Sequence, residues 1–349
     1  MTLDDLKRND PQDMYGLIAG FPRQVEEAVR IGSSASVRFP VRNIQNIVLT
    51  GLGGSAIGGD LLRSYLSDEL TVPLIVNRHY RLPSFVSRKT LVIVSSYSGN
   101  TEETISAYKD AVQRKARVIC ISTGGEVSAM AKKMKHPVIK TPPGLQPRAA
   151  LGYSFFPLLV VLSRLGFIKS KKKDIAETVK LLRTKTAPYR DPENPGNLPL
   201  HLAHSLQGKI PIIYSPAEHL DSVALRWRGQ IAENAKQLSF THVLPEMNHN
   251  ELVGWKARKE LLQQMQVIFL RDRGTHPRVA KREEITQSVI AQYAAGVLEV
   301  WSEGTSLLAR MFSLVHIGDW LSYYLAMLNQ EDPTPVKAID LLKAELAKG

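Results

Sequence analysis

Short apolar segments alternate with longer amphipathic segments over most of the chain, and this alternation predicts a parallel sheet covered by helices. Two segments, Thr90–Ser95 and Val118–Ser122, are apolar almost throughout, as parallel strands buried on both faces are. In the first half we expect strands at Ile44–Thr50, Val72–Val76, Thr90–Ser95, Val118–Ser122 and Val138–Ile139, and helices at Ile57–Leu66, Glu102–Arg114 and Ser128–Met134.

The same alternation begins again after the Pro- and Asn-rich stretch Asp191–Pro199, which we interpret as a hinge or linker. At roughly 100–200 residues per domain, a chain of 349 residues corresponds to two domains. We expect an N-terminal domain at 1–165, a helical connection at 166–199 and a C-terminal domain at 200–349. In the second half the pattern predicts strands at Ile210–Tyr214, Val243–Leu244, Val267–Leu270 and Val297–Trp301, and helices at Leu220–Lys236, Lys281–Ala294 and Ser306–Leu328.

Composition narrows the class of protein. With 44% hydrophobic and 22% charged residues, the chain is too apolar for a disordered protein. The longest apolar run, Phe155–Leu162, is too short to span a membrane, and the first residues carry no apolar signal-peptide core. The single cysteine, Cys120, excludes a disulfide framework and a thiolate zinc site. We therefore expect a cytoplasmic protein that does not bind membranes.

The net charge of +12 favours an anionic partner. Nucleic-acid-binding proteins usually concentrate their basic residues in a stripe or arm. Here the one dense cluster, Lys169 and Lys171–Lys173, lies between two predicted helices and is typical of a solvated helix boundary. A small anion such as a phosphorylated metabolite suits the sequence better than a nucleic acid.

A glycine-rich segment, Gly51-Leu-Gly53-Gly54-Ser55-Ala56, follows the first predicted strand and begins a helix. It fits the loose dinucleotide-binding pattern, and a helix N-terminus attracts anions. A dinucleotide site also needs an acidic residue at the end of the second strand, where this chain has Asn77 and Arg78. Arg78 could bind a 2′-phosphate, so a nicotinamide-dependent dehydrogenase stays an alternative.

A second loop, Ser96-Tyr97-Ser98-Gly99-Asn100-Thr101, follows the third predicted strand and precedes a helix. A helix cap needs one hydroxyl, and this loop offers three, on Ser96, Ser98 and Thr101. In a doubly wound sheet both loops lie at the carboxyl ends of strands, where ligands bind. The two loops together predict a site for a phosphomonoester.

The segment Ser302-Glu303-Gly304-Thr305 follows the last predicted strand and resembles this serine loop. The similarity suggests a duplicated domain. Glu303 would stand where a phosphate has to bind, so we expect that the second copy has lost its anion site and that each chain has one phosphate site.

These loops closely resemble the sugar isomerase (SIS) domain. Three later segments, Glu233-Asn-Ala-Lys236, Pro245-Glu-Met-Asn-His-Asn250 and Ile339-Asp-Leu-Leu-Lys343, resemble one branch, the bifunctional phosphoglucose/phosphomannose isomerases. The resemblance spans nearly the whole chain. It implies two SIS-type subdomains, each a mainly parallel, doubly wound, flavodoxin-like sheet flanked by helices. It also implies an aldose–ketose isomerase without cofactor or metal, and a homodimer with active sites near the subunit interface.

The resemblance also implies roles for individual residues. Gly53 and Gly54 would form the substrate loop, and Arg148 would lie near the reacting carbons. Glu233 would be the catalytic base, His249 would open the sugar ring from the partner subunit, and Lys343 would be a C-terminal active-site lysine. The side chains that would hold the phosphate are those of Ser55, Ser96, Ser98 and Thr101.

The residues themselves support Glu233 only in part. An isomerase of this kind needs a carboxylate that takes and returns one proton through an enediolate. Val223, Trp227 and Ile231 mark the buried stripe of the predicted helix, and Glu233 lies about 200° from Ile231. Its own face carries Arg226, Gly229 and Lys236, so a solvated glutamate among basic residues is the alternative. Gly229 would leave room for a ligand at a cost of about 1 kcal/mol against alanine.

Without the resemblance, the other candidates have simple structural explanations. His249 has a suitable ordinary pKa near 6.5, with Glu251 as a possible orienting partner, but most histidines are not catalysts. Arg148 follows a turn, and Lys343 lies near the chain end, where Pro333 and Pro335 direct the tail. The pair His201 and His204 has no further ligand at metal-site spacing.

We interpret the chain as an isomerase of glucose 6-phosphate and fructose 6-phosphate, and also of mannose 6-phosphate. Two alternatives are a non-catalytic SIS-type regulator that binds a sugar phosphate, and the NAD(P)-dependent dehydrogenase. A regulator would normally carry a helix-turn-helix, and the first ~40 residues show no convincing pair of short helices with a basic face.

Overall fold

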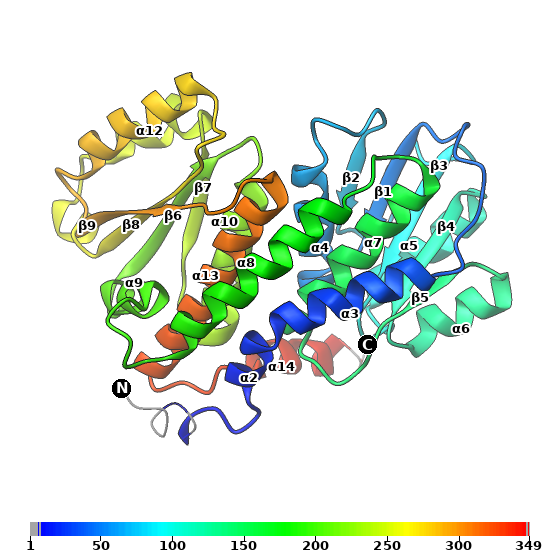
Figure 1. Ribbon diagram of the computed structural model, residues 1–349, viewed down its shortest axis with the longest axis horizontal. Coiled ribbons are helices and arrows are strands. Elements are labelled where there is room, and N and C mark those ends of the chain that lie inside the picture. The colour runs from blue at the N-terminus through cyan, green and yellow to red at the C-terminus, as the bar shows by residue number, and fades with distance from the viewer. Residues whose placement is uncertain (1–5, 7, 347, 349) are drawn as a thin grey trace. The chain divides into compact units, whose positions relative to one another are not determined.

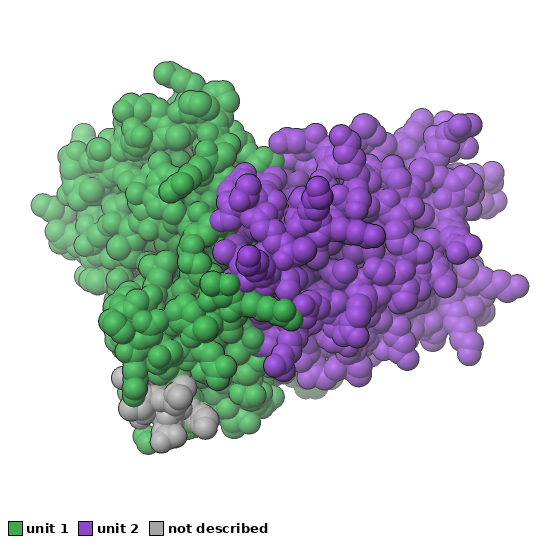
Figure 2. Space-filling view, in the orientation of Figure 1, with its two compact units in different colours: residues 1–19, 183–303, 312–349 green, residues 20–182, 304–311 purple. Residues whose placement is uncertain are grey.

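A computed structural model of the chain describes residues 6, 8–346 and 348 (Figure 1). The chain forms two compact units, which Figure 2 shows in green and purple. Unit 1 comprises residues 1–19, 183–303 and 312–349, and unit 2 comprises residues 20–182 and 304–311. Neither unit is one continuous stretch, and the helices α8 (Lys172–Arg190) and α13 (Leu307–Leu328) each contribute residues to both.

Unit 2 is built on a five-stranded sheet with the order β2-β1-β3-β4-β5, in which all neighbours are parallel. The central strand β3 is buried along its whole length, which explains its continuous apolar sequence. The strands are β1 (Asn46–Thr50), β2 (Leu74–Asn77), β3 (Thr90–Ser95), β4 (Arg117–Ser122) and β5 (Val138–Lys140), and the helices are α3 (Phe21–Ser34), α4 (Gly53–Tyr65), α5 (Glu102–Gln113), α6 (Gly125–Met134), η1 (Pro147–Ala149) and α7 (Leu151–Leu165).

Unit 1 is built on a four-stranded parallel sheet with the order β7-β6-β8-β9. Numbered within its own sheet, this order is second, first, third, fourth, as in unit 2. Its strands are β6 (Ile210–Pro216), β7 (Phe240–Leu244), β8 (Met265–Arg271) and β9 (Gly296–Trp301), and its helices are α2 (Met14–Ala19), α9 (Leu198–Leu206), α10 (Asp221–Ala235), η2 (Glu246–His249), η3 (Glu251–Gly254), α11 (Lys259–Leu262), α12 (Pro277–Ile290) and α14 (Lys337–Leu346).

The shared strand order is the flavodoxin-like one, so the predicted doubly wound α/β fold is confirmed for both sheets. In such sheets the loops at the carboxyl ends of the strands carry the ligand sites. For unit 2 these include the loops after β1 and β3, and for unit 1 those after β6 and β8.

Two segments differ from the sequence-based expectation. Residues 14–34 contain two helices, α2 and α3, which the pattern did not indicate. The stretch Asp191–Pro199, interpreted as a hinge, lies inside unit 1, and Pro199 belongs to α9. Its Asn197 is fully buried and donates hydrogen bonds to the carbonyl oxygens of Tyr189 and Asp191.

Within the described part of the chain, no helix is both long enough and apolar enough to cross a membrane.

Candidate functional site

The glycine loop, Gly51–Ala56, runs from the end of β1 into the first turn of α4 and is shaped by close backbone approaches. A Cβ atom on Gly51 would lie 2.7 Å from the carbonyl oxygen of Ser95, and one on Gly54 would lie 2.4 Å from that of Pro147. Gly53 adopts a positive φ of 50° with open space around it. The loop therefore packs against the end of β3 on one side and the turn that carries Arg148 on the other.

The serine loop after β3 brings two hydroxyl groups together. Ser96 is 1% exposed, and its Oγ lies 3.1 Å from the Oγ1 of Thr101. The backbone NH of Gly99 donates to the same Ser96 Oγ. Ser55 joins the two loops, because its Oγ accepts a 3.0 Å hydrogen bond from the backbone NH of Tyr97. Three of the four predicted phosphate-binding residues thus lie in one hydrogen-bonded arrangement.

Ser98 behaves differently. Its side chain is exposed, and its Oγ accepts a 3.3 Å bond from the backbone NH of Asn100 within the loop. Thr101 precedes α5 at the cap position, yet its side chain makes no capping bond and pairs with Ser96 instead. The loop thus keeps a hydroxyl pair that the helix does not use.

Tyr97 ties the serine loop to the segment that leads to Arg148. Its hydroxyl donates to the carbonyl oxygen of Pro142 at 2.8 Å and accepts from the backbone NH of Leu145 at 3.1 Å. Burial raises the pKa of this hydroxyl. Arg148 itself is 3% exposed, in the short helix η1. The sequence reasoning missed Tyr97, since an aromatic residue in a loop carries no signal of such a role.

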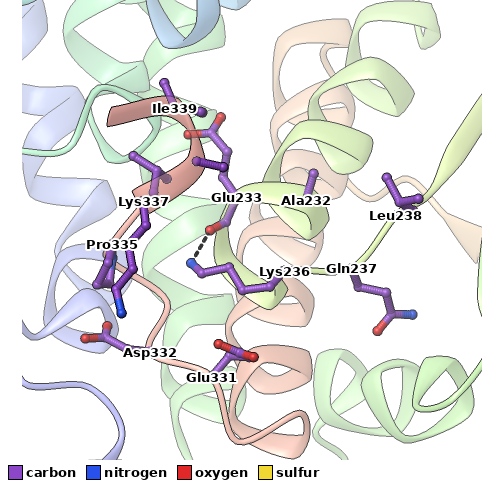
Figure 3. A pocket seen from close by; sticks show the side chains of 12 residues that line it. Ala232, Glu233, Lys236, Gln237, Leu238, Glu331, Asp332, Pro335, Lys337 and Ile339 are labelled. Carbon is purple, nitrogen blue, oxygen red and sulfur yellow. Dashed lines mark hydrogen bonds between the residues drawn. The ribbon is translucent and has the colours of Figure 1, made fainter. Parts of the chain in front are cut away.

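Glu233 lies near the C-terminal end of α10 and lines a pocket of about 490 Å³ (Figure 3). The glutamate is half-buried. Gly229, one turn earlier, has open space where a Cβ would stand. The residues that line the pocket are Ala232, Glu233, Lys236, Gln237, Leu238, Glu331, Asp332, Pro335, Val336, Lys337, Ala338 and Ile339.

Lys236 lines this pocket and forms hydrogen bonds to both of the segments that enclose it. The residue ends α10 in the left-handed conformation, with a φ of 55°. Its Nζ donates to the carbonyl oxygen of Glu233 at 2.6 Å, as Figure 3 shows, and to that of Pro333 at 3.3 Å. This contact joins α10 to the proline-containing tail segment, whose Pro333 is buried.

The predicted surroundings of Glu233 need one correction. Arg226 was expected to lie on the same solvated face, but it is 4% exposed and forms a 2.8 Å ion pair with Asp319 of α13. The error arises because helix periodicity places a residue on a face without revealing its partner, and Asp319 lies far along the chain. Lys236 is the basic residue of that face that remains exposed.

His249 ends the short helix η2 and is exposed. The suggestion that Glu251 orients it is not supported, because a carboxylate oxygen of Glu251 accepts a short hydrogen bond from the hydroxyl of Tyr214. The indole NH of Trp255 donates to the same Tyr214 hydroxyl at 3.0 Å. Burial raises the pKa of this hydroxyl. Asn248 fixes the segment further through a 2.8 Å bond to Thr286.

Lys343 lies on α14 and is exposed. Neither it nor His249 is among the residues that line the Glu233 pocket. Sequence reasoning missed most of that lining, which comes from residues 331–339. The only feature of the sequence that pointed to this part of the lining was the pair Pro333 and Pro335, which directs the tail.

The strand order corrects the position of the duplicated loop. Ser302–Thr305 follows β9, the fourth strand of its sheet, so its counterpart in unit 2 is the loop after β4. The counterpart of the serine loop is the segment after β8, residues 272–276. There Asp272 accepts a 3.1 Å bond from the backbone NH of Gly274 and a short one from the hydroxyl of Ser302. A carboxylate of the chain itself therefore accepts a hydrogen bond from the Gly274 NH of this loop and one from Ser302.

Comparison with known proteins connects both units to one family. The SIS domain family matches residues 41–144, and the bacterial phospho-glucose isomerase C-terminal SIS domain family matches residues 196–346. A bifunctional phosphoglucose/phosphomannose isomerase of Caldicellulosiruptor bescii is 48% identical over 337 residues, which cover 96% of this chain and 99% of that protein. The chain belongs to the bifunctional phosphoglucose/phosphomannose isomerase family.

A second member of this family, from Aquifex aeolicus, is 35% identical over 97% of this chain and 99% of its own. Solved structures share the fold at lower identity. A hypothetical protein of Thermus thermophilus has a TM-score of 0.75 at 16% identity, with coverage of 98% of this chain and 91% of its own. Glucosamine-6-phosphate deaminase of Thermotoga maritima has a TM-score of 0.68 at 15% identity, with coverage of 93% and 97%.

The residues that the bifunctional isomerase resemblance singles out divide between the units. Gly53, Gly54, Arg148 and the four hydroxyl residues belong to unit 2, whereas Glu233, His249 and Lys343 belong to unit 1. Unit 2 thus contains the residues predicted to bind an anion, and unit 1 contains those predicted to exchange protons.

Proposed function

We propose that this protein interconverts glucose 6-phosphate, fructose 6-phosphate and mannose 6-phosphate by proton transfer through an enediol. The observation that carries the proposal is the position of Glu233, a half-buried carboxylate that lines a pocket of about 490 Å³ at the end of α10. The family to which the chain belongs supports the choice of substrates.

The phosphate is held by unit 2. The Ser96–Thr101 hydroxyl pair and Ser55 present donors within one arrangement, and the glycine loop opens α4 with amides that favour an anion. The buried guanidinium of Arg148, held beside Gly54, supplies positive charge for the oxyanion that develops on the sugar.

Glu233 takes the proton from one of the first two carbons and returns it to the other. Glucose 6-phosphate and mannose 6-phosphate give the same enediol, because they differ only in the configuration at C2. One base therefore serves both aldoses if the pocket allows rotation about the C2–C3 bond.

His249 would open the sugar ring, and Lys343 would complete the site. Both side chains are exposed in the single chain, and the resemblance implies that His249 acts from the partner subunit. We accordingly propose a homodimer with active sites near the subunit interface. The cytoplasmic location stays a prediction.

The decisive experiment replaces Glu233 with glutamine. A positioned general base contributes about 10²–10⁴-fold, so kcat should fall by that factor, and solvent deuterium should no longer enter the substrate C–H positions. A phosphorylated sugar-acid inhibitor should bind as before, since the phosphate is held elsewhere. Asp221→Asn, which alters the other acid of α10, is the matched control and should keep kcat within about twofold.

Normal deuterium exchange in Glu233→Gln would show that the base lies elsewhere. Turnover that stops after treatment with a chelator would contradict the metal-free reaction. If fructose 6-phosphate is bound but never converted, the regulator hypothesis gains, and if conversion requires added nicotinamide cofactor, the dehydrogenase hypothesis does.

A further inference from the structure

One stripe of α10 is polar although it is buried. Arg226, Gln230 and Asn234 follow one another at four-residue spacing, and they are 4%, 5% and 0% exposed. The neighbouring stripe of Val223, Trp227 and Ile231 is apolar, as the core-facing side of a helix normally is.

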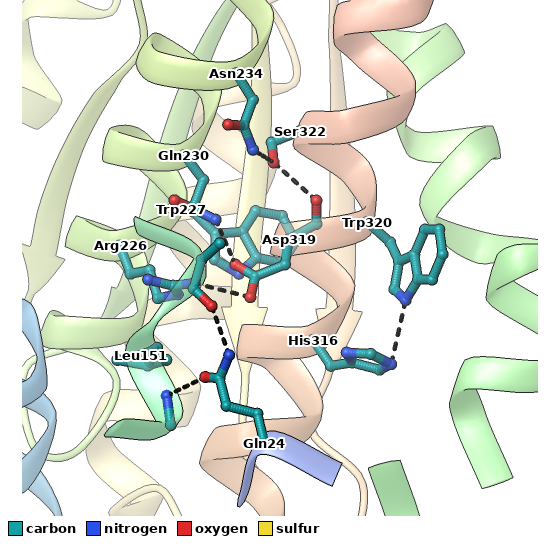
Figure 4. A network of polar contacts seen from close by, with 12 residues as sticks. Gln24, Leu151, Arg226, Trp227, Gln230, Asn234, His316, Asp319, Trp320 and Ser322 are labelled. Atoms are coloured by element: carbon teal, nitrogen blue, oxygen red, sulfur yellow. Dashed lines mark hydrogen bonds and ion pairs between the residues drawn. The ribbon is translucent and has the colours of Figure 1, made fainter. Parts of the chain in front are cut away.

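Each side chain of the polar stripe has a partner on α13 (Figure 4). Arg226 and Gln230 donate to the two carboxylate oxygens of Asp319, at 2.8 and 2.9 Å. The amide of Asn234 donates to the Oγ of Ser322 at 3.0 Å, and this hydroxyl donates in turn to the carbonyl oxygen of Asp319 at 2.8 Å. We call these five residues the α10–α13 network.

Apolar packing brings the same two helices close. The indole NH of Trp227 donates to the carbonyl oxygen of Leu314 at 2.8 Å. A Cβ on Gly318 would lie 2.3 Å from the indole nitrogen, so the glycine is what allows the ring to lie against α13. The packing and the α10–α13 network therefore act on the same segment of α10.

The network is better suited to specificity than to stability. A buried ion pair loses hydration on folding, and apolar replacements are often equally stable. Hydrogen bonds differ from apolar contacts in being directional, so they fix both the rotation and the register of α10 on α13. Buried polar groups are retained in some proteins because they specify one arrangement of a core.

Glu233 is sensitive to that rotation. It directly precedes Asn234, the last member of the network. A helix with its side chains is about 10–12 Å across, so a carboxylate lies about 5–6 Å from the axis, and a turn of 20° would move it by about 2 Å. Misplacement of a catalytic group by 1 Å can reduce a rate by about 10²-fold.

We propose that the α10–α13 network is a positioning device for Glu233, which fixes the approach of its carboxylate to C1 and C2 of the sugar. This inference rests on the role proposed for Glu233 above. It assigns to Asn234, Gln230 and Asp319 an effect on catalysis that does not involve contact with the substrate.

The test replaces Asn234 and Ser322 together, which removes the bond between them and the bond from Ser322 to the carbonyl oxygen of Asp319. In Asn234→Leu/Ser322→Ala neither new side chain carries a polar atom that needs a partner, so the variant should stay folded. We expect a kcat about 10–100-fold lower with fructose 6-phosphate, with KM within about twofold of wild type. The initial ratio of glucose 6-phosphate to mannose 6-phosphate should change by about threefold or more, because the ratio depends on how the base faces C2.

Thr186→Val is the matched control. It removes the 3.0 Å hydrogen bond between Thr186 and His316, which joins α8 to α13 without involving α10. Both kcat and the product ratio should stay within about twofold of wild type. If the double variant fails to fold, Gln230→Met, which keeps the Arg226–Asp319 ion pair, is judged by the same criteria.

The proposal is overturned if kcat per folded molecule and the product ratio of the network variant both match those of Thr186→Val. If wild type forms no mannose 6-phosphate, kcat alone decides. Glu233→Gln separates the two hypotheses: normal turnover in that variant refutes the role of Glu233, whereas loss of turnover there, with no effect of the network variant, refutes only the positioning.

Discussion

The serine loop after β3 and the loop after β8 occupy the same place in two sheets of the same strand order, yet their chemistry differs. The first offers a pair of hydroxyls, Ser96 and Thr101, which bond to each other. The second contains Asp272, whose carboxylate accepts bonds from Gly274 and Ser302. A neutral hydroxyl pair can turn toward an incoming phosphate, whereas a fixed carboxylate repels one.

The difference extends to the helices. The helix after the first strand of each sheet is α4 in unit 2 and α10 in unit 1. α4 begins at the glycine loop and contributes its N-terminus, whereas α10 carries Glu233 near its C-terminal end. The proposed roles accordingly divide between the two sheets of one fold, with anion binding assigned to unit 2 and proton transfer to unit 1.

The largest expected effect concerns the serine loop, where Gly99→Ala should lower the free energy of unfolding. Gly99 has a φ of 76°, and an added Cβ would lie 1.9 Å from the carbonyl oxygen of Gly124. Left-handed strain and overpacking together should lower the free energy of unfolding by about 3–4 kcal/mol, as measured by urea denaturation.

Gly53→Ala is the control for this prediction. Gly53 also has a positive φ, of 50°, but nothing lies within 4 Å of its Cβ position. Its replacement should lower the free energy of unfolding by only about 1 kcal/mol. Equal losses in the two variants would mean that the contact with Gly124 does not hold the serine loop.

The next effect concerns binding. Thr101→Ala should raise KM for fructose 6-phosphate by about 10–100-fold and change kcat little, because one hydrogen bond to a charged group contributes about 1.5–3 kcal/mol. Asp272→Asn, at the corresponding loop of unit 1, should leave KM unchanged. Steady-state kinetics of both variants test the comparison directly, and a similar rise of KM in both would refute it.

The last difference lies in the pH dependence of stability, and it follows from the acids of unit 1. Burial raises the pKa of Glu283 from 4.5 to about 7, against the opposing charge of Arg271, whose Nε lies 3.1 Å away. Between these values the folded chain binds more protons than the unfolded one, so stability falls as pH rises from about 4.5 to 7. The slope is at most about 1.4 kcal/mol per pH unit.

Glu283→Gln should flatten this slope in urea denaturation between pH 5 and 8. Glu284→Gln is its matched control, because Glu284 is exposed and pairs with Lys281. That variant should keep the wild-type slope. Identical slopes for wild type and Glu283→Gln would show that the buried carboxyl does not titrate in this range.

Sequence patterns predicted most strands and helices, because these elements depend on residues that are close in the chain. The bounds of β3, Thr90–Ser95, are those expected from its apolar run, and the remaining predicted strands overlap the observed ones. The helix α3 was missed because Pro22 and Gly32 obscure its pattern, although Phe21, Val25 and Ala28 form a buried face.

The candidate site was predicted less completely, because its contacts join residues that are distant in sequence. Nothing in the sequence around Arg226 indicates its ion pair with Asp319. Likewise, nothing around Gly54 indicates its close approach to the backbone of Pro147. The duplicated loop was assigned to the wrong strand. The similarity of Ser302–Thr305 to the serine loop is visible in a few residues, whereas the strand order depends on how the whole sheet is assembled. The roles of Glu233, His249 and Lys343 remain predictions.

The open space beside Gly229 has a practical consequence. A cysteine introduced there would stand on α10 one turn before Glu233, with nothing within 4 Å of its Cβ. The native Cys120 is fully buried, and burial raises the pKa of its thiol to about 12, so it reacts poorly with alkylating reagents. A fluorophore or nitroxide could therefore be attached at this single position, and a change of its signal on addition of a sugar phosphate would test whether that ligand binds beside α10.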